Sequence, residues 1–554
     1  MRWTKGRIAL LSLVVVGLAG WQLFSRYFYY LPGLVESFRD PLQSHRPIAW
    51  NRGPDTAART ASERPPNIIV ILADDLGWND VTFNGGGVAG GSVPTPRIDS
   101  IARDGVSFMQ GYAGNATCAP SRAAIMTGRY ATRFGFEFTP TPKQFSRLVA
   151  SYKLAGTTPG HYHADREKDF PKNINDLVVP QSEVMIGQAL KSRGYHTVML
   201  GKWHLGGTET ARPSARGFDE ALAFHEGAAM FLPENDPRVV NSKQEFDPID
   251  KFLWANLRHA IRYNGGPSFQ PDLYMTDYLG REAARAIEAN RNRPFMMYLA
   301  YNAPHTPLQA LKSDYDALAH IADHRLRVYG AMIRALDRSV GVVLDALKAQ
   351  GLEDNTLVIF SSDNGGANYV GLPDLNKPFR GWKATFFEGG LRVPYFMKWP
   401  ARIPAGVRYE KPIGHVDIFT TAVAAAEAAV PSDRTIDGVN LVPYVTGART
   451  GEPHKALYWR SGHYKVVLSG NWKLQVSERP NKVWLFDLST DPLEKNDLSR
   501  SHPAKLEELR KALAEIDGQQ VPPSFPSLME APVLIDKPLN VEVRPDDELV
   551  FWAN

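Results

Sequence analysis

The chain has 554 residues and a single cysteine, Cys118. One cysteine excludes an intrachain disulfide and any zinc site built from several thiolates. The 63 basic and 59 acidic side chains give a formal net charge of +4, which does not suggest the concentrated basic stripe of a nucleic-acid-binding protein. With 44% hydrophobic and 22% charged residues, the composition is typical of a globular protein and excludes wholesale disorder.

Residues 1–30 have the pattern of an export signal or a membrane anchor. Arg2, Lys5 and Arg7 precede an apolar run from Ile8 to Phe24, and an aromatic group follows at 27–30. Signal-peptide cores have about 7–15 apolar residues and spanning helices about 17–25. The aromatic group favours an uncleaved anchor, and the basic residues before the run place the rest of the chain in the periplasm or another extracytoplasmic space. Cleavage at small residues within the run would instead give a secreted protein.

Residues 31–66 are polar and contain proline and arginine, which predicts a linker, and residues 67–445 have the pattern of an α/β domain. Asn67–Ala73 is a continuous apolar, β-branched run, typical of a strand buried on both faces. Strand-like runs at 197–200, 295–301, 356–361 and 393–397 alternate with helical patterns at 182–193, 273–292 and 325–350. This alternation predicts a large, mainly parallel sheet flanked by helices.

A C-terminal subdomain and tail are predicted for residues 446–554. Short strand-like runs separated by turn residues lie at 456–459, 464–468, 472–476 and 483–487, and a helical pattern follows at 503–515. They predict a small antiparallel sheet with one helix. The Pro-rich stretch 522–554 is expected to wrap the surface.

Oxygen-bearing side chains follow two of the predicted strands. Asp74 and Asp75 come directly after the first, and Asp363 and Asn364 come directly after another, within Ser362–Gly366. Ligands of open α/β sheets bind beyond the carboxyl ends of the strands. Asp and Asn often only cap helices or form turns, but two such pairs favour a site for a hard cation such as Ca²⁺ or Mg²⁺.

The lone cysteine lies in Cys118-Ala119-Pro120-Ser121-Arg122, and Thr127-Gly128-Arg129 follows four residues later. This run resembles the signature of the sulfatase family, whose members have an alkaline phosphatase-like α/β fold. Further segments resemble the family's motifs in the family's order and extend the resemblance over roughly residues 66–498: Leu72–Trp78, Gly201–Gly206, Asn302–Pro307, Ser362–Gly366, Gly381–Gly390 and Leu485–Glu494. Asn79 departs from the pattern, because relatives usually have glycine there.

The resemblance implies an arylsulfatase-like sulfuric ester hydrolase. A formylglycine-generating maturation enzyme would oxidise Cys118 to Cα-formylglycine, acting on the unfolded chain before or during export. Ca²⁺ would be held by Asp74, Asp75, Asp363 and Asn364, and an oxygen of the modified residue 118 would complete its ligands. It would polarise a sulfate oxygen and help to hold one oxygen of the hydrated aldehyde as the nucleophile.

The resemblance also implies roles for five cationic or titratable side chains. Arg122 would orient the diol, and Lys202 and Lys383 would supply positive charge to the sulfate oxygens. The diol would attack sulfur and form an enzyme-bound sulfate ester. His305, whose expected neutral-range pKa suits proton transfer, would protonate the leaving alcohol, with a share for Lys383. His204 would then take a proton from the free hydroxyl, which expels sulfate and regenerates the aldehyde.

The substrate, a sulfated small molecule or glycan, is not defined by the sequence. An aryl sulfate and a sulfated sugar both fit, and the stretches 136–179 and 208–271 are expected to form pocket loops. Within them His161, His163, Trp254 and His259 could contact the organic group, although a solvated loop position is the better explanation for each one taken singly. Two alternatives stay open: a phosphate or phosphonate monoester hydrolase of the same superfamily, and a non-catalytic surface protein on this fold.

Overall fold

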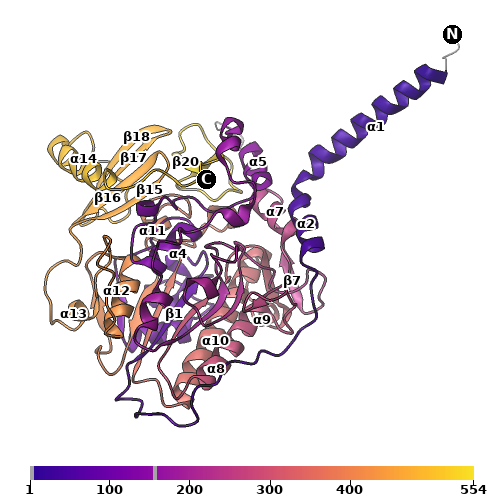
Figure 1. Ribbon diagram of the computed structural model, residues 1–554. Coiled ribbons are helices and arrows are strands. Elements are labelled where there is room, and N and C mark those ends of the chain that lie inside the picture. Colours follow the sequence, from indigo (N-terminus) through magenta and orange to yellow (C-terminus); the bar gives the residue numbers. More distant parts are fainter. Residues whose placement is uncertain (1–4, 154–158) are drawn as a thin grey trace.

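The computed structural model describes residues 5–153 and 159–554 of the chain. The N-terminal helix α1 (Lys5–Tyr27) projects away from the folded body, and a short turn leads from it into α2 (Leu31–Arg39) (Figure 1). Arg2, one of the basic residues of the predicted anchor, lies outside the described residues. No helix in the described part of the chain is both long and apolar enough to cross a membrane.

The segment predicted to be a linker, residues 31–66, is instead packed on the folded body. After α2 the chain runs along the body, and Ile48 and Trp50 are buried in its core with 2% and 7% of their surface exposed. The indole Nε1–H of Trp50 donates to Glu282 Oε2 at 3.1 Å. The linker prediction differs from the structure because these two apolar residues stand among polar neighbours and produce no periodic pattern.

A nine-stranded mixed sheet forms the centre of the molecule, in the order β13-β2-β12-β11-β1-β9-β5-β6-β8. The five strands from β11 to β6 run parallel, whereas β12 and β8 run antiparallel to their neighbours. The predicted large, mainly parallel sheet is therefore confirmed. The strands are β1 (Asn67–Ala73), β2 (Val106–Phe108), β5 (His196–Lys202), β6 (Glu220–Phe224), β8 (Arg262–Tyr263), β9 (Phe295–Ala300), β11 (Thr356–Ser362), β12 (Tyr395–Lys398) and β13 (Val407–Tyr409).

Helices cover both faces of this sheet, which explains why its central strands are apolar without alternation. Along β1, Ile69 and Ile71 face one hydrophobic cluster, while Ile68 and Val70 face another. The first cluster includes residues of α3 (Pro96–Arg103), α8 (Met275–Ala289) and α10 (His324–Ala349), and the second includes residues of α4 (Cys118–Thr127), α6 (Ile186–Lys191) and α12 (Val416–Ala425).

The helix predicted over 182–193 is shorter in the structure. It is confined to α6, which begins where the side-chain Oε1 of Gln188 accepts a hydrogen bond from the Met185 backbone N–H at 2.9 Å. That contact satisfies a backbone donor at the start of the helix. The apolar spacing of the flanking residues continues beyond the ends of the helix and therefore overstates its length.

The C-terminal region contains the predicted antiparallel sheet of four strands, β15 (Leu457–Ser461), β16 (Tyr464–Ser469), β17 (Trp472–Glu478) and β18 (Asn481–Asp487). Helix α14 (Pro503–Asp517) packs on it. The tail beyond residue 522 does more than wrap the surface: β19 (Met529–Leu534) pairs with β20 (Leu549–Ala553) and with β4 (His161–Tyr162). Met529 and Ile535 are fully buried, so the tail is part of the core.

Candidate active site

The sheet register brings the two predicted carboxylate segments together. Strands β1 and β11 are parallel neighbours with Ala73 opposite Ser362, so both chains leave the sheet at the same edge. The backbone N–H of Asp75 donates to Asp363 Oδ1 at 3.1 Å. Asp74, Asp75, Asp363 and Asn364 are all buried, which places these four oxygen-bearing side chains in one enclosed cluster.

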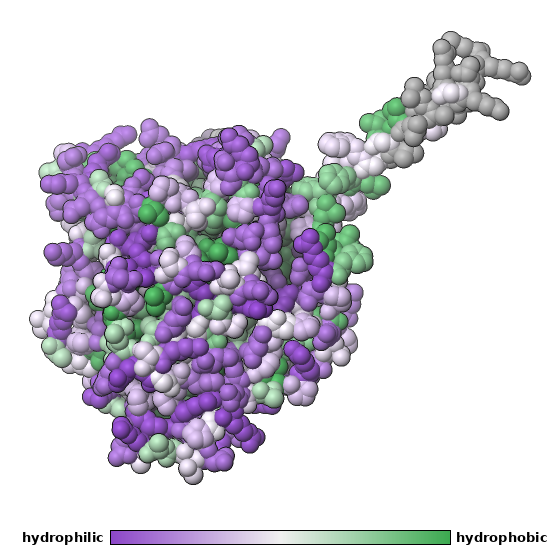
Figure 2. All heavy atoms as spheres, viewed as in Figure 1, coloured by the Kyte–Doolittle hydropathy of each residue, from purple (hydrophilic) through white to green (hydrophobic). Residues whose placement is uncertain are grey.

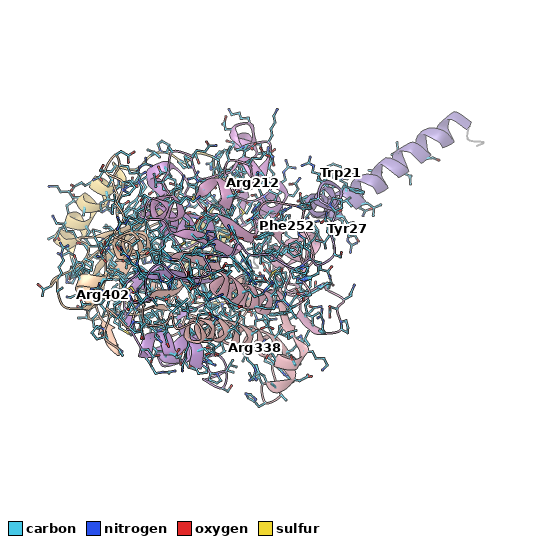
Figure 3. The ribbon with its side chains drawn as sticks, turned by 60° about the horizontal axis from the view of Figure 1, so that its bottom comes forward. Trp21, Tyr27, Arg212, Phe252, Arg338 and Arg402 are labelled. Atoms are coloured by element: carbon cyan, nitrogen blue, oxygen red, sulfur yellow. The ribbon has the colours of Figure 1, made fainter. Side chains whose placement is uncertain are left out.

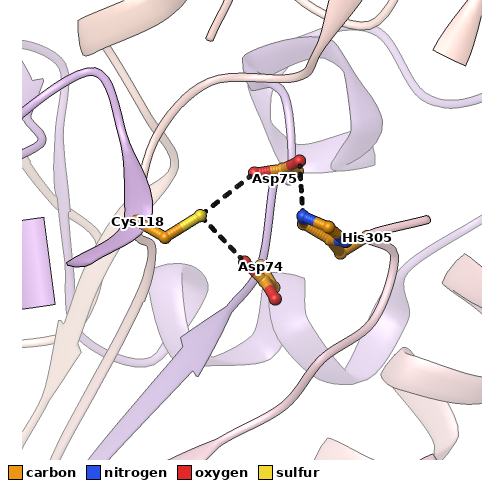
Figure 4. A group of neighbouring side chains, drawn as sticks. All are labelled: Asp74, Asp75, Cys118 and His305. Atoms are coloured by element: carbon orange, nitrogen blue, oxygen red, sulfur yellow. Dashed lines mark hydrogen bonds and ion pairs between the residues drawn. The ribbon is translucent and has the colours of Figure 1, made fainter. Parts of the chain in front are cut away.

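Cys118 is the first residue of α4, and its side chain points into this cluster. Its Sγ lies 3.7 Å from Asp74 Oδ1 and 3.9 Å from Asp75 Oδ1 (Figure 4). Burial raises the pKa of the Cys118 thiol to about 12, so an unmodified thiol stays protonated and is a poor nucleophile. The sulfur atom therefore marks a reactive position without being a suitable reactive group itself.

Three buried cations surround the carboxylates, and all three were predicted. Lys202 Nζ bonds both oxygens of Asp74, at 2.8 and 2.9 Å. Lys383 Nζ lies 2.8 Å from Asp75 Oδ1 and 2.9 Å from Asp75 Oδ2.

Arg122, the third cation, spans two carboxylates. Its Nη2 lies 2.7 Å from Asp363 Oδ2 and 3.4 Å from Asp74 Oδ1. The cluster therefore holds fixed positive groups before any ligand arrives, which is the arrangement that stabilises developing negative charge.

The carboxylates have unequal proton affinities. Burial raises the pKa of Asp74 to about 7, although Lys202 opposes the shift, and the neighbouring Asp363 carboxylate adds to it. Burial also acts on Asp75 and Asp363, but Lys383 and Arg122 respectively outweigh it and hold both pKa values below their usual range. The cluster thus contains mutually repelling carboxylates, a situation that a bound cation relieves.

The donor set suits a hard cation, and one atom in it lacks a partner. Asn364 donates through Nδ2 to Asp75 Oδ1 and to the Gly365 carbonyl, at 2.8 and 2.9 Å, but its buried Oδ1 has no hydrogen-bond partner among the described residues. An unpaired buried oxygen beside carboxylates fits a Ca²⁺ ligand. The Asp74, Asp75 and Cys118 ligand atoms also lie within 4.8 Å of one another and of a ring nitrogen of His305, a neighbour that the predicted ligand set did not contain.

The two predicted histidines are buried and neutral. His305 Nδ1 contacts the Thr306 carbonyl at 2.5 Å, and its Nε2 lies 3.6 Å from Asp75 Oδ2. Burial lowers the pKa of His305 to about 3, which is below the neutral range expected from the sequence. Burial, aided by Lys202, likewise holds the pKa of His204 well below its usual value.

The backbone is strained at two of these positions. Asp75 has φ 62° and His204 has φ 57°, in the left-handed region that non-glycine residues seldom occupy. Gly365 is required for a different reason: a Cβ there would lie 1.8 Å from the Gly389 carbonyl oxygen. Glycine at 365 therefore lets the segment that carries Asp363 and Asn364 pass close to the backbone at Gly389, which fixes that segment in place.

Two contributors to the site were not predicted. The Tyr369 hydroxyl donates to Asp75 Oδ2 at 2.9 Å, and His415 lies between Ser361 Oγ and Ser121 Oγ at 2.9 and 3.1 Å. His415 thereby links strand β11 to helix α4. Neither residue lies in a segment with a recognisable pattern, so no sequence signal could have identified them.

Cys118, His204, His305 and Lys383 line one cavity of about 450 Å³. The four residues proposed as possible substrate contacts do not line it. His161 and His163 line a separate cavity of about 840 Å³. Trp254 donates its indole N–H to Asp250 Oδ2 at 3.0 Å, and buried His259 lies between the carbonyls of Met230 and Pro271 at 3.1 and 3.3 Å.

The fold and this site define the class of protein. The sulfatase family profile matches residues 66–428, and a profile for the C-terminal part of N-sulphoglucosamine sulphohydrolase matches residues 380–519. The chain belongs to the sulfatase family of the alkaline phosphatase-like superfamily and is a sulfuric ester hydrolase.

Individual relatives agree with this assignment. Human N-acetylgalactosamine-6-sulfatase is 30% identical over 84% of this chain and 83% of its own length, and the mouse steryl-sulfatase is 30% identical over 73% and 69%. Among solved structures, Ps i-CgsB in complex with k-i-k-neocarrahexaose is 33% identical with a TM-score of 0.67, covering 83% of this chain and 95% of that one. A phosphonate monoester hydrolase of Agrobacterium radiobacter, 18% identical with a TM-score of 0.57 over 82% and 96%, shares the fold.

Proposed function

We propose that the protein hydrolyses sulfate monoesters of an organic molecule to the alcohol and inorganic sulfate, using Cα-formylglycine formed from Cys118 and a bound Ca²⁺ ion. The observation that carries this proposal is the position of Cys118 Sγ, which lies at the cavity and within 3.9 Å of two buried carboxylates. Lys202 and Lys383 are already fixed beside those carboxylates.

The residues of the site fit both the Ca²⁺ ion and Cα-formylglycine. Asp74, Asp75, Asp363 and Asn364 would hold Ca²⁺, and the atom at the position of Cys118 Sγ would be an oxygen of hydrated formylglycine. When bound, these groups supply Lewis acidity and a geminal diol nucleophile. An unmodified thiol with a pKa near 12 supplies neither.

The chain's own side chains position the reactants and move protons. Lys383 lines the cavity and would contact sulfate oxygens there, whereas Lys202, fully buried against Asp74, would contribute through its positive charge. Arg122 is held by Asp363 and by the Lys202 carbonyl, at 2.7 and 3.2 Å, and would orient the modified residue 118 one helical turn away.

Proton transfer is assigned to the groups at the cavity wall. His204 is neutral, and its buried Nδ1 has no partner in the part of the chain that the structure describes, which suits a base that accepts a proton. Burial by itself would lower the pKa of Lys383, but the neighbouring Asp75 carboxylate outweighs burial and raises this pKa well above its usual value. Lys383 thus carries a proton at rest, whereas His305 does not, and the charge states favour Lys383 as the donor to the leaving alcohol with His305 as its partner.

The direct test is a comparison of sulfate and phosphate monoesters of one phenol, such as 4-nitrophenyl sulfate and 4-nitrophenyl phosphate. We expect the sulfate to have the higher kcat/KM and the activity to fall when a calcium chelator is added and to return with Ca²⁺. A higher kcat/KM for the phosphate would favour the phosphate or phosphonate monoester hydrolase. Relatives with at least 30% identity are sulfatases, whereas the phosphonate monoester hydrolase shares only the fold.

The relatives support a sulfated sugar as one substrate class, because an N-acetylgalactosamine-6-sulfatase and a complex with a neocarrahexaose are among them. We further propose that the chain is exported, that α1 attaches it to a membrane, and that a maturation enzyme modifies residue 118. Sequencing the N-terminus of the mature protein tests the attachment, since a chain beginning near Gly20 would have lost most of α1.

A further inference from the structure

The active-site cavity has two ends of different chemistry. One end is polar and contains the reactive cluster described above. The other end is apolar, and its wall is formed by side chains from α5 (Lys143–Ser151), from α7 (Pro248–Asn256) and the residue after it, and from β20. We call these residues the apolar wall: Phe145, Val149, Phe252, Leu253, Leu257 and Trp552.

The apolar wall is a packed hydrophobic cluster continuous with the site. Phe145 and Phe252 meet edge to face, with ring centroids 5.3 Å apart. Val149 and Ala531 are buried in the same cluster, and Leu253 and Trp552 pack against it. Because Cys118 and Phe252 line one cavity, a molecule that places a sulfate at the polar end can extend its remaining atoms to this wall.

Polar and charged side chains also line the cavity, and some of them are already paired within the protein. Arg262, which also lines the cavity, is already paired with Asp40 at 2.7 Å and with Glu36 at 3.3 Å. The buried indole Nε1 of Trp552 has no hydrogen-bond partner among the described residues. Arg212 also lines the cavity, and its buried Nε likewise has no partner among the described residues. Spare donors beside a large apolar wall fit a ligand with a large hydrocarbon surface and a few oxygen atoms.

The N-terminal segment borders the same end of the cavity. Pro32 and Gly33 of α2 line it, and the Gly33 N–H donates to Asn256 Oδ1 of α7 at 2.6 Å. On α2, Leu34 and Phe38 expose 55% and 79% of their surface.

The surface around the base of α1 is apolar and lies close to the apolar end of the cavity. Apolar residues gather where α1 leaves the body (Figure 2), and the cavity residue Phe252 lies near Tyr27 at that place (Figure 3). The apolar end of the cavity therefore lies beside an exposed apolar surface.

We propose that the substrate is an amphiphile, a sulfate monoester joined to a bulky apolar group that rests on the apolar wall. This proposal rests on the proposed sulfatase function and names the substrate class. The apolar group would come either from a molecule dissolved in water or from one held in a lipid surface beside α2.

The first experiment compares 4-methylphenyl sulfate with 4-octylphenyl sulfate. The two esters have nearly the same leaving group, so the reactivity of the sulfate is constant and only the buried apolar area changes. We expect kcat/KM for the octyl ester to be at least about tenfold higher, since each buried methylene adds about fourfold in affinity at best. Equal values for the two esters would overturn the proposal.

The second experiment assigns that preference to the apolar wall. Leu253→Asn and Leu257→Asn are tested separately, because both side chains are only partly buried and such variants are expected to fold. We expect each to lower the octyl-to-methyl ratio of kcat/KM by about fivefold or more. Leu344→Asn on α10, a partly buried leucine outside the cavity, is the matched control and should leave the ratio unchanged. A ratio unmoved in both cavity variants would contradict the proposal.

The source of the amphiphile is tested with 4-octylphenyl sulfate free in solution and in phosphatidylcholine vesicles. Faster hydrolysis in vesicles supports a lipid source, and faster hydrolysis of the free ester supports a dissolved one. Failure of the proposed function has a different result, because then 4-nitrophenyl sulfate and both alkylphenyl esters would all be inert. Activity on 4-nitrophenyl sulfate without a tail preference would overturn only the amphiphile proposal.

Discussion

Among the described residues, two buried charge clusters differ in their access to the active-site cavity. The reactive cluster comprises the cations and carboxylates around Cys118. The second, which we call the junction cluster, comprises Glu388, Lys473 and Glu494. In it Lys473 Nζ lies 2.8 Å from Glu388 Oε1 and 3.0 Å from Glu494 Oε1, and all three side chains are fully buried.

The junction cluster has its partners within the protein. The Glu388 backbone N–H donates to Glu494 Oε2 at 2.6 Å, and the Tyr112 hydroxyl donates to Glu388 Oε2 at 3.0 Å. None of its side-chain atoms is among the unpaired buried atoms of the described residues, whereas Asn364 Oδ1 and His204 Nδ1 of the reactive cluster are. Buried charge alone therefore does not mark an active site. Access from a cavity and unpaired buried atoms do, whereas strained backbone does not, because Glu494 of the junction cluster also has a positive φ, 53°.

The largest expected effect is at Cys118. Cys118→Ser supplies one hydroxyl without a geminal partner, so sulfate transferred to it could not be expelled by the second hydroxyl. We expect substrate binding to persist and turnover to fall by at least about a thousandfold, in line with removal of a catalytic nucleophile. Steady-state kinetics and the mass of the variant after exposure to substrate check this. Normal multiple turnover by the serine variant would refute the mechanism.

The second largest effect is expected from removing the positive charge of Lys383. Lys383→Ala takes away a fixed charge beside Asp75 and should lower kcat/KM for sulfate monoesters by about 10²- to 10³-fold. Steady-state kinetics on 4-nitrophenyl sulfate measure the loss, and circular dichroism confirms that the variant is folded. A loss below about threefold in a folded variant would remove Lys383 from the reaction.

The matching change in the junction cluster should affect stability and leave the reaction intact. Lys473→Met leaves two buried carboxylates without their cation and should lower the free energy of unfolding by about 3–5 kcal/mol. Urea denaturation measures the loss, and kcat per folded molecule should be that of the parent protein. If kcat fell as it does for Lys383→Ala while stability were retained, the distinction between the clusters would be lost.

The smallest expected effect is the loss of stability on replacing Glu548 in the C-terminal tail. Burial opposes ionisation of Glu548, but hydrogen bonds from Lys482 and Arg380 outweigh it and lower the pKa of Glu548 to about 2. Its stabilisation is therefore present above the ordinary pKa near 4.5 and is lost as the pH falls from about 4.5 to about 2. The Glu548 side chain has 32% of its surface exposed, so solvent screens these contacts and Glu548→Gln should cost about 1–2 kcal/mol at pH 7.

Urea titrations at several pH values check the Glu548 prediction. The difference between the parent protein and the glutamine variant should shrink as the pH falls below about 4.5. A difference that stays constant down to about pH 2 would show that charge is not the source of the stabilisation.

The sequence predicted most of what depends on local pattern and motif. Strand β1 was predicted to the residue, and the register of β1 on β11 brings together the Asp and Asn residues expected at one sheet edge. The packing of Trp50 and the strands of the tail were missed, because long-range contacts rather than periodicity fix them. The same holds for Tyr369 and His415, which reach the site only through the folded chain. The low pKa of His305 depends on burial, which a motif does not reveal.

The central claim is that residue 118 acts as formylglycine and not as a thiol. The most direct measurement is peptide mass spectrometry of the segment carrying residue 118, made on protein that hydrolyses 4-nitrophenyl sulfate. We predict the mass of an aldehyde or its hydrate in place of cysteine, in a fraction of molecules that matches the active fraction. Fully active protein with an unmodified Cys118 thiol would contradict the account.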